Sequence, residues 1–233
     1  QLHLHIPAPT LPATPRIPVT TTPRTNLPAS LTSFVGRTAA VVEVTHLITN
    51  HRLVTLTGAG GVGKTRLALE VGKTFVERQP ARSLAFPDGV WFVDLAPLTD
   101  PQAIPQRILD LWRVPEQPDR STLEALSAYL RTKESLLILD NCEHLINACA
   151  ELAETLLQQC PQLSLLATSR EALNIGGETP WRVPSLTRPR TSAGWDGQSS
   201  AGQPAFTPDA LSRFEAVALF VERARVRQPS FTL

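Results

Sequence analysis

Short apolar runs alternate with longer amphipathic stretches through the middle of the 233-residue chain. The short runs are rich in Leu, Ile and Val, as expected of strands that are buried on both faces of a parallel sheet. This alternation of strand and helix predicts an α/β fold with helices on both faces of the sheet. The predicted strands are residues 53–57, 90–95, 136–140, 163–168 and, as a weaker candidate, 181–183.

The longer stretches place apolar residues three or four positions apart, which predicts amphipathic helices. A further apolar stripe near the chain end predicts a helix that extends to about Arg227. Ser212 and Glu215 have the spacing of a capping box, so we expect that helix to begin there. The other predicted helices span residues 64–78, 103–114, 122–133 and 144–160.

Two stretches without either pattern divide the chain. Seven of the 21 prolines fall between Pro7 and Pro28, and proline removes amide donors and disfavours helix. Residues 1–28 are therefore predicted to be a Pro/Thr-rich disordered linker, although a PxxP spacing leaves an SH3-type ligand open. Residues 187–208 are rich in Gly, Ser, Pro and Thr and are predicted to form a flexible loop. Residues 29–186 then form the folded core.

Charge and composition exclude several classes of protein. The 22 basic and 21 acidic residues leave a formal net charge of +1, which gives no reason to expect a nucleic-acid or membrane surface. The three cysteines form no CxxC pair, which argues against a zinc site or a disulfide scaffold. The longest purely apolar run, residues 216–221, is too short to span a bilayer. We expect a cytoplasmic protein, and the absence of any methionine suggests a piece of a longer chain.

The strongest motif is a glycine-rich loop between the first predicted strand and the helix after it. Residues 58–65 match GxxxxGK[ST], the pattern of a phosphate-binding loop. Glycines allow a tight turn that aims N–H groups at phosphate oxygens, and the following helix N-terminus adds partial positive charge. Lys64 is expected near the β- and γ-phosphates, and Thr65 is expected to ligate Mg²⁺. The predicted nucleotide-binding residues here are Gly58, Ala59, Gly60, Gly61, Val62, Gly63, Lys64, Thr65 and Arg66.

A second candidate is Asp140, which follows four apolar residues at the end of a predicted strand. In P-loop proteins an acid at this place holds Mg²⁺ together with the loop hydroxyl, although an Asp that caps the next helix has the same pattern. Glu143 is the nearest carboxylate and either positions the attacking water or stabilises the helix dipole. Asn141 occupies a position where many relatives of this fold carry an acid, which argues against fast hydrolysis.

A third candidate follows the predicted strand 163–168. Ligands of an open parallel sheet lie beyond the carboxyl ends of its strands, so Ser169 and Arg170 are expected to reach the γ-phosphate. Arg170 suits phosphate because its donors are planar and forked; the alternative is a surface arginine in a loop. The candidate catalytic residues are therefore Lys64, Asp140, Glu143 and Arg170, and the candidate metal ligands are Thr65 and Asp140.

Together these segments resemble the STAND class of P-loop ATPases, specifically the NB-ARC-like domains of large LuxR-type bacterial regulators. The resemblance runs from about Leu27 to Leu233 and includes the sequences FVGR, GAGGVGKT, LLILD, LLATSR and FEAVALFVERA. It implies a three-layer αβα P-loop NTPase fold with a mainly parallel five-stranded sheet in the order 5-1-4-3-2. The FVGR segment is similar to an adenine-side motif, which implies nucleotide contacts from Val35, Gly36 and Arg37. Arg170 then corresponds to a γ-phosphate-sensing arginine.

The resemblance implies a molecular switch that binds ATP or ADP with Mg²⁺. In such proteins ADP holds a closed state, and exchange for ATP permits self-association, with slow hydrolysis in the full-length parent. Residues 209–233 correspond to the first helix of a lid subdomain that continues beyond Leu233, so weak affinity and little regulated hydrolysis are expected of this piece. A P-loop kinase, a motor-type ATPase and a nucleotide-free interaction scaffold are the alternatives. Neither membrane association nor direct nucleic-acid binding is expected.

Overall fold

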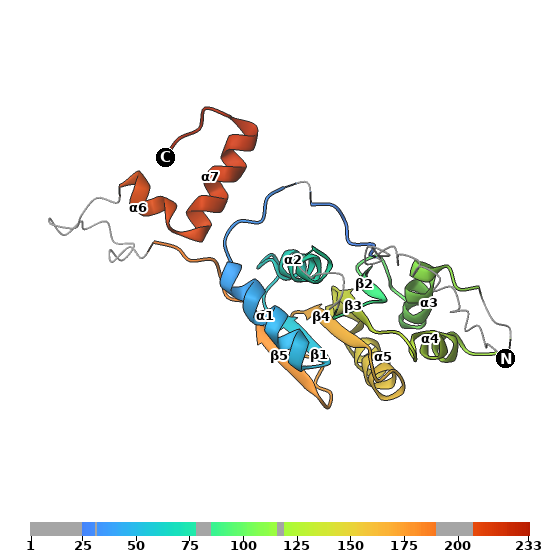
Figure 1. Ribbon diagram of the computed structural model, residues 1–233. Coiled ribbons are helices and arrows are strands. Elements are labelled where there is room, and N and C mark those ends of the chain that lie inside the picture. Colours follow the sequence, from blue (N-terminus) through green and yellow to red (C-terminus); the bar gives the residue numbers. More distant parts are fainter. Residues whose placement is uncertain (1–24, 31, 78–84, 116–118, 190–206) are drawn as a thin grey trace, which may run out of the picture.

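The computed structural model describes residues 25–30, 32–77, 85–115, 119–189 and 207–233. At its centre lies a five-stranded sheet in the order β2-β3-β4-β1-β5, in which each neighbouring pair is parallel (Figure 1). The predicted order 5-1-4-3-2 is this arrangement read from the opposite edge, and it is confirmed. The strands are β1 (Leu53–Thr57), β2 (Gly89–Asp94), β3 (Ser135–Asp140), β4 (Ser164–Ser169) and β5 (Glu178–Arg182).

Helices cover both faces of the sheet and give the three layers that the sequence predicts. Two helices and the strand residues that face them form one apolar cluster, and three helices form a second cluster on the opposite face. The first face carries α1 (Thr38–Asn50) and α2 (Lys64–Glu77); the second carries α3 (Ile104–Leu109), α4 (Thr122–Leu130) and α5 (Ile146–Gln159).

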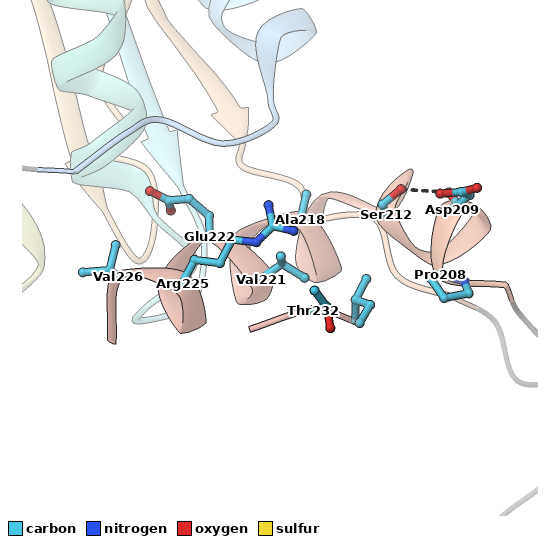
Figure 2. A pocket seen from close by; sticks show the side chains of 10 residues that line it. Pro208, Asp209, Ser212, Ala218, Val221, Glu222, Arg225, Val226 and Thr232 are labelled. Carbon is cyan, nitrogen blue, oxygen red and sulfur yellow. Dashed lines mark hydrogen bonds between the residues drawn. The ribbon is translucent and has the colours of Figure 1, made fainter. Parts of the chain in front are cut away.

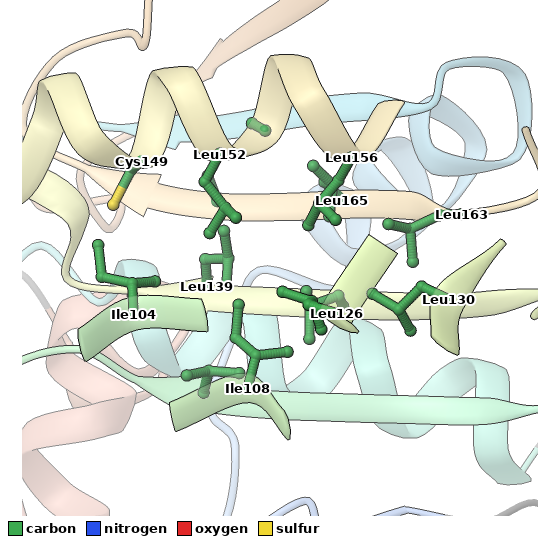
Figure 3. Packing of buried hydrophobic residues seen from close by; sticks show 14 of the residues in the cluster. Ile104, Ile108, Leu126, Leu130, Leu139, Cys149, Leu152, Leu156, Leu163 and Leu165 are labelled. Atoms are coloured by element: carbon green, nitrogen blue, oxygen red, sulfur yellow. The ribbon is translucent and has the colours of Figure 1, made fainter. Parts of the chain in front are cut away.

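The position of strand β3 inside the sheet, between β2 and β4, explains why its sequence is continuously apolar. Leu136 and Ile138 belong to the cluster on the α1–α2 face, whereas Leu137 and Leu139 belong to the cluster on the other face. Figure 3 shows Leu139 and its neighbours between α5 and the short helices α3 and α4. All four side chains are fully buried, and burial of each stabilises the fold by about 1.5–3 kcal/mol. A central parallel strand is therefore readable from its sequence because neither face meets water.

Two of the predicted helices begin or end differently in the structure. The helix predicted over residues 103–114 is divided into α3 and two flanking 3₁₀ turns, Pro101–Ala103 and Asp110–Trp112. Arg113 then takes a left-handed φ of 53°, which ends the helical run. The helix predicted over 144–160 begins with a 3₁₀ turn, Cys142–Leu145, and becomes α-helical only from Ile146.

The structure adds α1, for which the sequence analysis gives no prediction. Val41, Val44 and Ile48 are buried at helical spacing against the sheet. The apolar stripe is thus present in the sequence, but its β-branched residues favour strand as much as helix, which hides it. This helix matters for function because it begins directly after the FVGR segment.

The C-terminal unit consists of α6 (Pro208–Ser212) and α7 (Glu215–Arg227), which stand apart from the sheet in Figure 1. The predicted helix exists, but the predicted capping box is wrong. The Ser212 hydroxyl donates to the carbonyl of Asp209, and the Glu215 carboxylate binds residues outside α7. A hollow of about 660 Å³ lies beside α7, with Val221 and Val226 in its lining (Figure 2).

The last residues of the predicted linker contact the edge of the sheet. Thr25 forms a parallel bridge with Val90, and the Asn26 carboxamide donates to the carbonyl of Phe92 at 2.8 Å and accepts from its amide at 2.7 Å. This covers part of edge strand β2, whose backbone groups are otherwise exposed. Thr25 and Asn26, at the end of the predicted linker, thus contact β2, and residues 1–24 of that linker lie outside the described ranges.

The predicted loop at 187–208 is described only at its two ends, because residues 190–206 lie outside the described ranges. At one end the Thr187 hydroxyl accepts from the amide of Glu215, and at the other the Thr207 hydroxyl caps α6. Both ends are thus tied to the C-terminal unit. In the ranges that the structure describes, no helix is long and apolar enough to cross a membrane.

Candidate functional site

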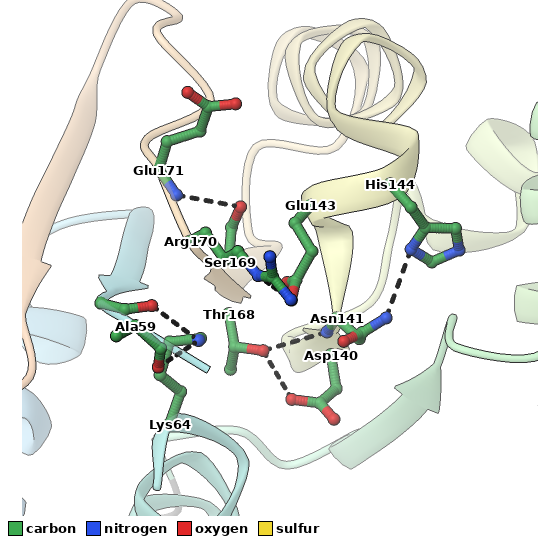
Figure 4. Close-up of polar contacts among 11 residues, drawn as sticks. Ala59, Lys64, Asp140, Asn141, Glu143, His144, Thr168, Ser169, Arg170 and Glu171 are labelled. Atoms are coloured by element: carbon green, nitrogen blue, oxygen red, sulfur yellow. Dashed lines mark hydrogen bonds and ion pairs between the residues drawn. The ribbon is translucent and has the colours of Figure 1, made fainter. Parts of the chain in front are cut away.

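The glycine-rich loop joins β1 to the first turn of α2, as its sequence predicts (Figure 4). Gly58, Gly61 and Gly63 have φ values of 147°, 75° and 94°, which side chains with a Cβ rarely adopt. Lys64 is the first residue of α2, and its Nζ donates to the carbonyl oxygens of Gly58 at 2.8 Å and Ala59 at 3.2 Å. The loop thus curves around the lysine ammonium, next to the free N–H groups of a helix N-terminus.

The two candidate metal ligands meet at the carboxyl end of the sheet. The Thr65 hydroxyl lies 2.8 and 3.0 Å from the two carboxylate oxygens of Asp140, although 75 residues separate them in the sequence. A carboxylate and a hydroxyl are oxygen donors of the kind that Mg²⁺ prefers, so this pair fits the ion. Asp140 is only 6% exposed, and its burial raises the pKa of its carboxyl. The nearby carboxylates of Asp94 and Glu143 raise it further, a charge excess that a bound cation would relieve.

Thr168, the residue before Ser169 in β4, contacts the candidate metal ligand Asp140. Its hydroxyl donates to Asp140 at 2.5 Å and accepts from the amide of Asn141 at 3.0 Å. Asn141 takes a left-handed φ of 67°, so Thr168 fixes both the acid and the turn after it. Thr168 therefore orients the candidate metal ligand. Figure 4 shows this pair of bonds beside Lys64.

Ser169 and Arg170 follow at the same edge of the sheet. Ser169 is fully buried and pairs with Thr57, the residue before the glycine-rich loop. Its hydroxyl accepts from the amide of Glu171 at 3.4 Å. The Arg170 side chain lies near the loop, because a Cβ placed on Gly60 would be 3.8 Å from its Nη2. The predicted γ-phosphate residues are thus adjacent to the loop, and Arg170 is the one with an exposed side chain.

Glu143 forms an ion pair with Arg170. Its Oε1 lies 3.3 Å from Arg170 Nε, and its Oε2 is buried with no hydrogen-bond partner among the described residues. The arginine side chain is 69% exposed, so the pair is partly screened by solvent. The sequence analysis offers two roles for Glu143, water positioning and dipole stabilisation, and the structure adds a third, as the partner of Arg170.

A cavity of about 260 Å³ borders the glycine-rich loop at residues 61–63. Four parts of the chain line it: residues 32–35 with Arg37, the loop with the start of α2, Leu186 after β5, and one face of α7. The predicted residues Val35, Arg37 and Arg66 are in its lining. The Arg66 guanidinium donates to the carbonyl of Thr32, which joins α2 to the first of these segments.

Arg37, which the resemblance places at the nucleotide, is a buried charge. It is 9% exposed, and burial lowers the pKa of its guanidinium. Its Nη2 donates to the carbonyl of Pro184 at 2.8 Å. A Cβ placed on Gly63 would lie 2.8 Å from its Nη1, so the guanidinium packs directly on the phosphate-binding loop. The FVGR segment and the loop therefore form one continuous site.

Helix α7 contributes residues that the sequence analysis does not predict. Leu219 and Arg223 line the cavity, and Glu215 lies one turn earlier on the same helix face. The Glu215 carboxylate accepts from the Arg37 amide at 2.6 Å. The spacing of four residues marks one face of the helix, but nothing local in the sequence shows which segment that face meets.

The all-parallel sheet with its phosphate-binding loop defines a P-loop NTPase fold. The AAA domain family matches residues 47–175, more than half of the chain, and the chain belongs to this family. Nucleotide binding follows from that membership. The match contains the loop, Asp140 and Arg170 but not the FVGR segment or α7.

Relatives occur among mycobacterial proteins. One from Mycobacterium bovis, named "Putative HTH-type transcriptional regulator", is 40% identical over 187 residues, which are 80% of this chain and 18% of that protein. An uncharacterized protein of Mycobacterium tuberculosis is 38% identical over 203 residues, 87% of this chain and 44% of its own length. The chain thus spans less than half of either relative.

Two solved structures match this chain at low sequence identity. A chain of the Drosophila ORC bound to DNA has a TM-score of 0.52 and 13% identity, covering 75% of this chain and 51% of that chain. A STAND protein with a tetratricopeptide repeat sensor from Pyrococcus horikoshii has a TM-score of 0.48 and 18% identity. It covers 93% of this chain and 28% of that chain. The similarity to the Drosophila ORC chain concerns the fold alone.

Proposed function

We propose that the chain is the ATP/ADP-binding switch domain of a bacterial signalling or transcriptional regulator. The observation that carries the proposal is the contact of Thr65 with Asp140 directly beside Lys64. A hydroxyl, a buried carboxylate and a lysine at one helix N-terminus are the groups that hold a Mg²⁺–nucleotide in P-loop proteins. The similarity to a mycobacterial protein with a regulator's name supports the regulatory setting.

In this proposal each group has a separate task. The loop amides and Lys64 bind the phosphates, Thr65 and Asp140 hold Mg²⁺, and the cavity next to Arg37 takes the base. Mg²⁺ neutralises charge on the phosphates when it is bound. Arg170 detects the γ-phosphate, because its exposed side chain lies near the loop at Gly60 and is paired, among the described residues, with Glu143.

Hydrolysis in this proposal is slow and serves to reset the switch. The carboxylate nearest to Asp140 along the chain, Glu143, is engaged with Arg170, and Asn141 offers an amide instead of a base. A γ-phosphate that draws Arg170 away would release Glu143 to orient water. Exchange of ADP for ATP would then change this ion pair, and self-association of the full-length protein would follow from that change.

The test is equilibrium binding of ADP and ATP with Mg²⁺ to the wild-type chain and to Lys64→Ala. Loss of the lysine removes a charge from the phosphates, and we expect affinity to fall by about 100-fold, a loss typical of a desolvated charge-assisted contact. Glu77→Ala, at the far end of α2, is the matched control and should bind as the wild type does. Equal affinity for wild type and Lys64→Ala would contradict the proposal and favour a nucleotide-free scaffold.

The rival enzyme classes make different predictions. A P-loop kinase transfers the γ-phosphoryl group to an acceptor, with a turnover of about 1–100 s⁻¹. A motor-type ATPase hydrolyses ATP continuously. The exposed position of Arg170 and its pairing with Glu143 favour a sensor instead. Turnover of that size, measured by phosphate release from Mg-ATP with and without small acceptors, would replace the switch with one of these classes.

A further inference from the structure

Glu215 is the first residue of α7, and its carboxylate binds two segments outside that helix. Its Oε1 accepts from the Arg37 amide at 2.6 Å, and its Oε2 accepts from the Thr187 amide at 3.1 Å. The Thr187 hydroxyl accepts in turn from the Glu215 amide at 3.0 Å. One side chain therefore joins α7 to the residues before α1 and to those after β5.

This contact supplies what the N-terminus of α1 lacks. Arg37 is the N-cap of α1, and no side chain of that position caps the helix in the described structure. The first amides of a helix need acceptors, and a negative charge there is favourable to the helix dipole. The Glu215 carboxylate accepts from the amide of the N-cap residue Arg37 and places a negative charge at this helix end, although 178 residues separate the two in the sequence. The bonds from Arg37 and Thr187 lower the pKa of its carboxyl, so it is ionised at neutral pH.

The same contact holds an unusual turn in place. Gly36 and Arg37 have consecutive left-handed φ values of 72° and 58°, and a non-glycine residue in that region is strained. A Cβ on Gly36 would lie 2.8 Å from the Glu215 Oε1, so glycine lets the carboxylate come this close. The turn directs the Arg37 guanidinium onto Gly63 of the phosphate-binding loop.

Further contacts between α7 and the segment 32–37 lie along the helix face that carries Glu215. The Ser33 hydroxyl bonds to Glu222, and Arg223 donates to the Ser33 carbonyl at 3.3 Å. Leu219, one turn after Glu215, reaches the cavity between these contacts. The segment 32–37 is thus joined to α7 at two places. Glu215 bonds to Arg37 at the start of the helix, and Glu222 and Arg223 bond to Ser33 two turns later.

We propose that Glu215 is a positioning residue for the nucleotide, which sets the base-side wall of the cavity by joining α7 to the segment 32–37. This inference rests on the proposed function, because it assigns the 260 Å³ cavity to the base. In the described structure the carboxylate of Glu215 bonds to the amides of Arg37 and Thr187 and to neither Lys64 nor Thr65. Its loss should therefore weaken binding of a nucleotide but not binding of free pyrophosphate, whereas a merely structural defect would weaken both.

The experiment measures ADP and pyrophosphate binding by calorimetry for wild type and Glu215→Ala in the full 233-residue chain. We expect the dissociation constant for ADP to rise about tenfold, as for loss of charge-assisted hydrogen bonds, and that for pyrophosphate to stay within about twofold. The matched control is Glu124→Ala. Glu124 caps α4 through Ser121, far from the cavity, so its loss should lower thermal stability without changing either affinity.

Two more variants guard against misfolding of Glu215→Ala. Glu215→Gln keeps the size and one acceptor oxygen, so we expect a folded protein with an intermediate ADP affinity. Gly36→Ala leaves Glu215 in place but pushes its carboxylate away, so it should reproduce the selective loss of ADP affinity. Agreement between Gly36→Ala and Glu215→Ala would show that the contact, rather than the charge alone, positions the base.

Different results overturn different claims. Unchanged ADP affinity in both Glu215→Ala and Gly36→Ala, or an equal loss of ADP and pyrophosphate, overturns the positioning role while the proposed function stands. A wild-type chain that binds neither ligand, or binds both with the affinity of Lys64→Ala, overturns the proposed function and the inference with it.

Discussion

The two sides of the candidate site are built in different ways. On the phosphate side, a short contiguous loop meets the ends of β3 and β4, and the sheet itself brings Thr65, Asp140 and Thr168 together. On the base side, the segment 32–37, which has no regular structure, meets one face of α7 through side-chain contacts. The phosphate side is therefore rigid by construction, whereas the base side depends on a few polar contacts.

This difference assigns separate tasks to the two sides of the proposed nucleotide site. A parallel sheet fixes the carboxyl ends of its strands to one another, so the groups that hold phosphate and metal are pre-arranged. The wall on the base side is instead held by polar contacts of Glu215 and Ser33 that lie outside the apolar core. Loss of a group that holds phosphate or metal, such as Lys64 or Asp140, should thus cost more affinity than a change in the base-side wall.

The largest effect expected in this comparison is loss of the metal contribution in Asp140→Asn. The carboxylate is the charged ligand of the candidate pair, and since loss of even an outer-shell partner of a metal ligand costs about 10–100-fold in metal affinity, we expect a loss of at least that size. Affinity for Mg-ADP should fall by a similar factor, while affinity for ADP in EDTA should change little. The measurement is ADP binding with and without Mg²⁺, and an equal loss in both conditions would contradict the role of Asp140 as a metal ligand.

A smaller effect is expected from Leu219→Ala on the base side. Leu219 lines the cavity, and removal of methylenes from an apolar contact weakens discrimination by about 10–200-fold at most. We expect ADP affinity to fall about tenfold, with no change for pyrophosphate. Phe220→Ala is the control, because Phe220 is 59% exposed and does not line the cavity. Equal effects of the two changes would place the base elsewhere.

Arg170→Ala should separate ATP from ADP. An exposed arginine that contacts only the γ-phosphate contributes to triphosphate binding, so we expect ATP affinity to fall about fivefold, near the value of one partly screened charge pair. ADP affinity should be unaffected, and Arg113→Ala, at the turn after α3, serves as the matched control. Parallel losses for ATP and ADP would argue against a sensing role.

The smallest effect concerns stability and its dependence on pH. Burial raises the pKa of Asp140, so the folded chain binds this proton more tightly than the unfolded chain does. The corresponding stabilisation is present below the unfolded pKa and is lost as pH rises through the raised folded pKa. Without Mg²⁺, Asp140→Asn should therefore melt a few degrees above the wild type at neutral pH, and the difference should shrink on acidification. A constant difference across that range would contradict the assignment.

The sequence predicts the phosphate side well for a physical reason. Lys64 and Thr65 belong to a contiguous motif, and Asp140 ends a strand whose apolar residues show that it is central. Since parallel strands end at one edge, these residues had to meet. Thr168 is the exception: its position follows from the strand, but a hydroxyl at that edge can serve a phosphate or a neighbouring acid equally well.

The base side is predicted only through the resemblance, and only in part. The FVGR segment is recognisable, but the partner of Arg37 is not, because Glu215 lies 178 residues away. The spacing of Ser212 and Glu215 even predicts a local capping box, which is wrong because Glu215 caps α1 instead of its own helix. Contacts between segments that no regular element aligns leave no local signal in the sequence.

Amide hydrogen exchange of the wild-type chain, with and without Mg-ADP, tests the central claim most directly. Each exchanging amide reports protection at its own place, so one experiment examines both sides of the site. The account predicts slower exchange on addition of Mg-ADP in residues 58–65 and also in residues 32–37. Unchanged exchange in residues 58–65 at a saturating concentration of Mg-ADP would contradict the claim that this chain binds nucleotide at its phosphate-binding loop.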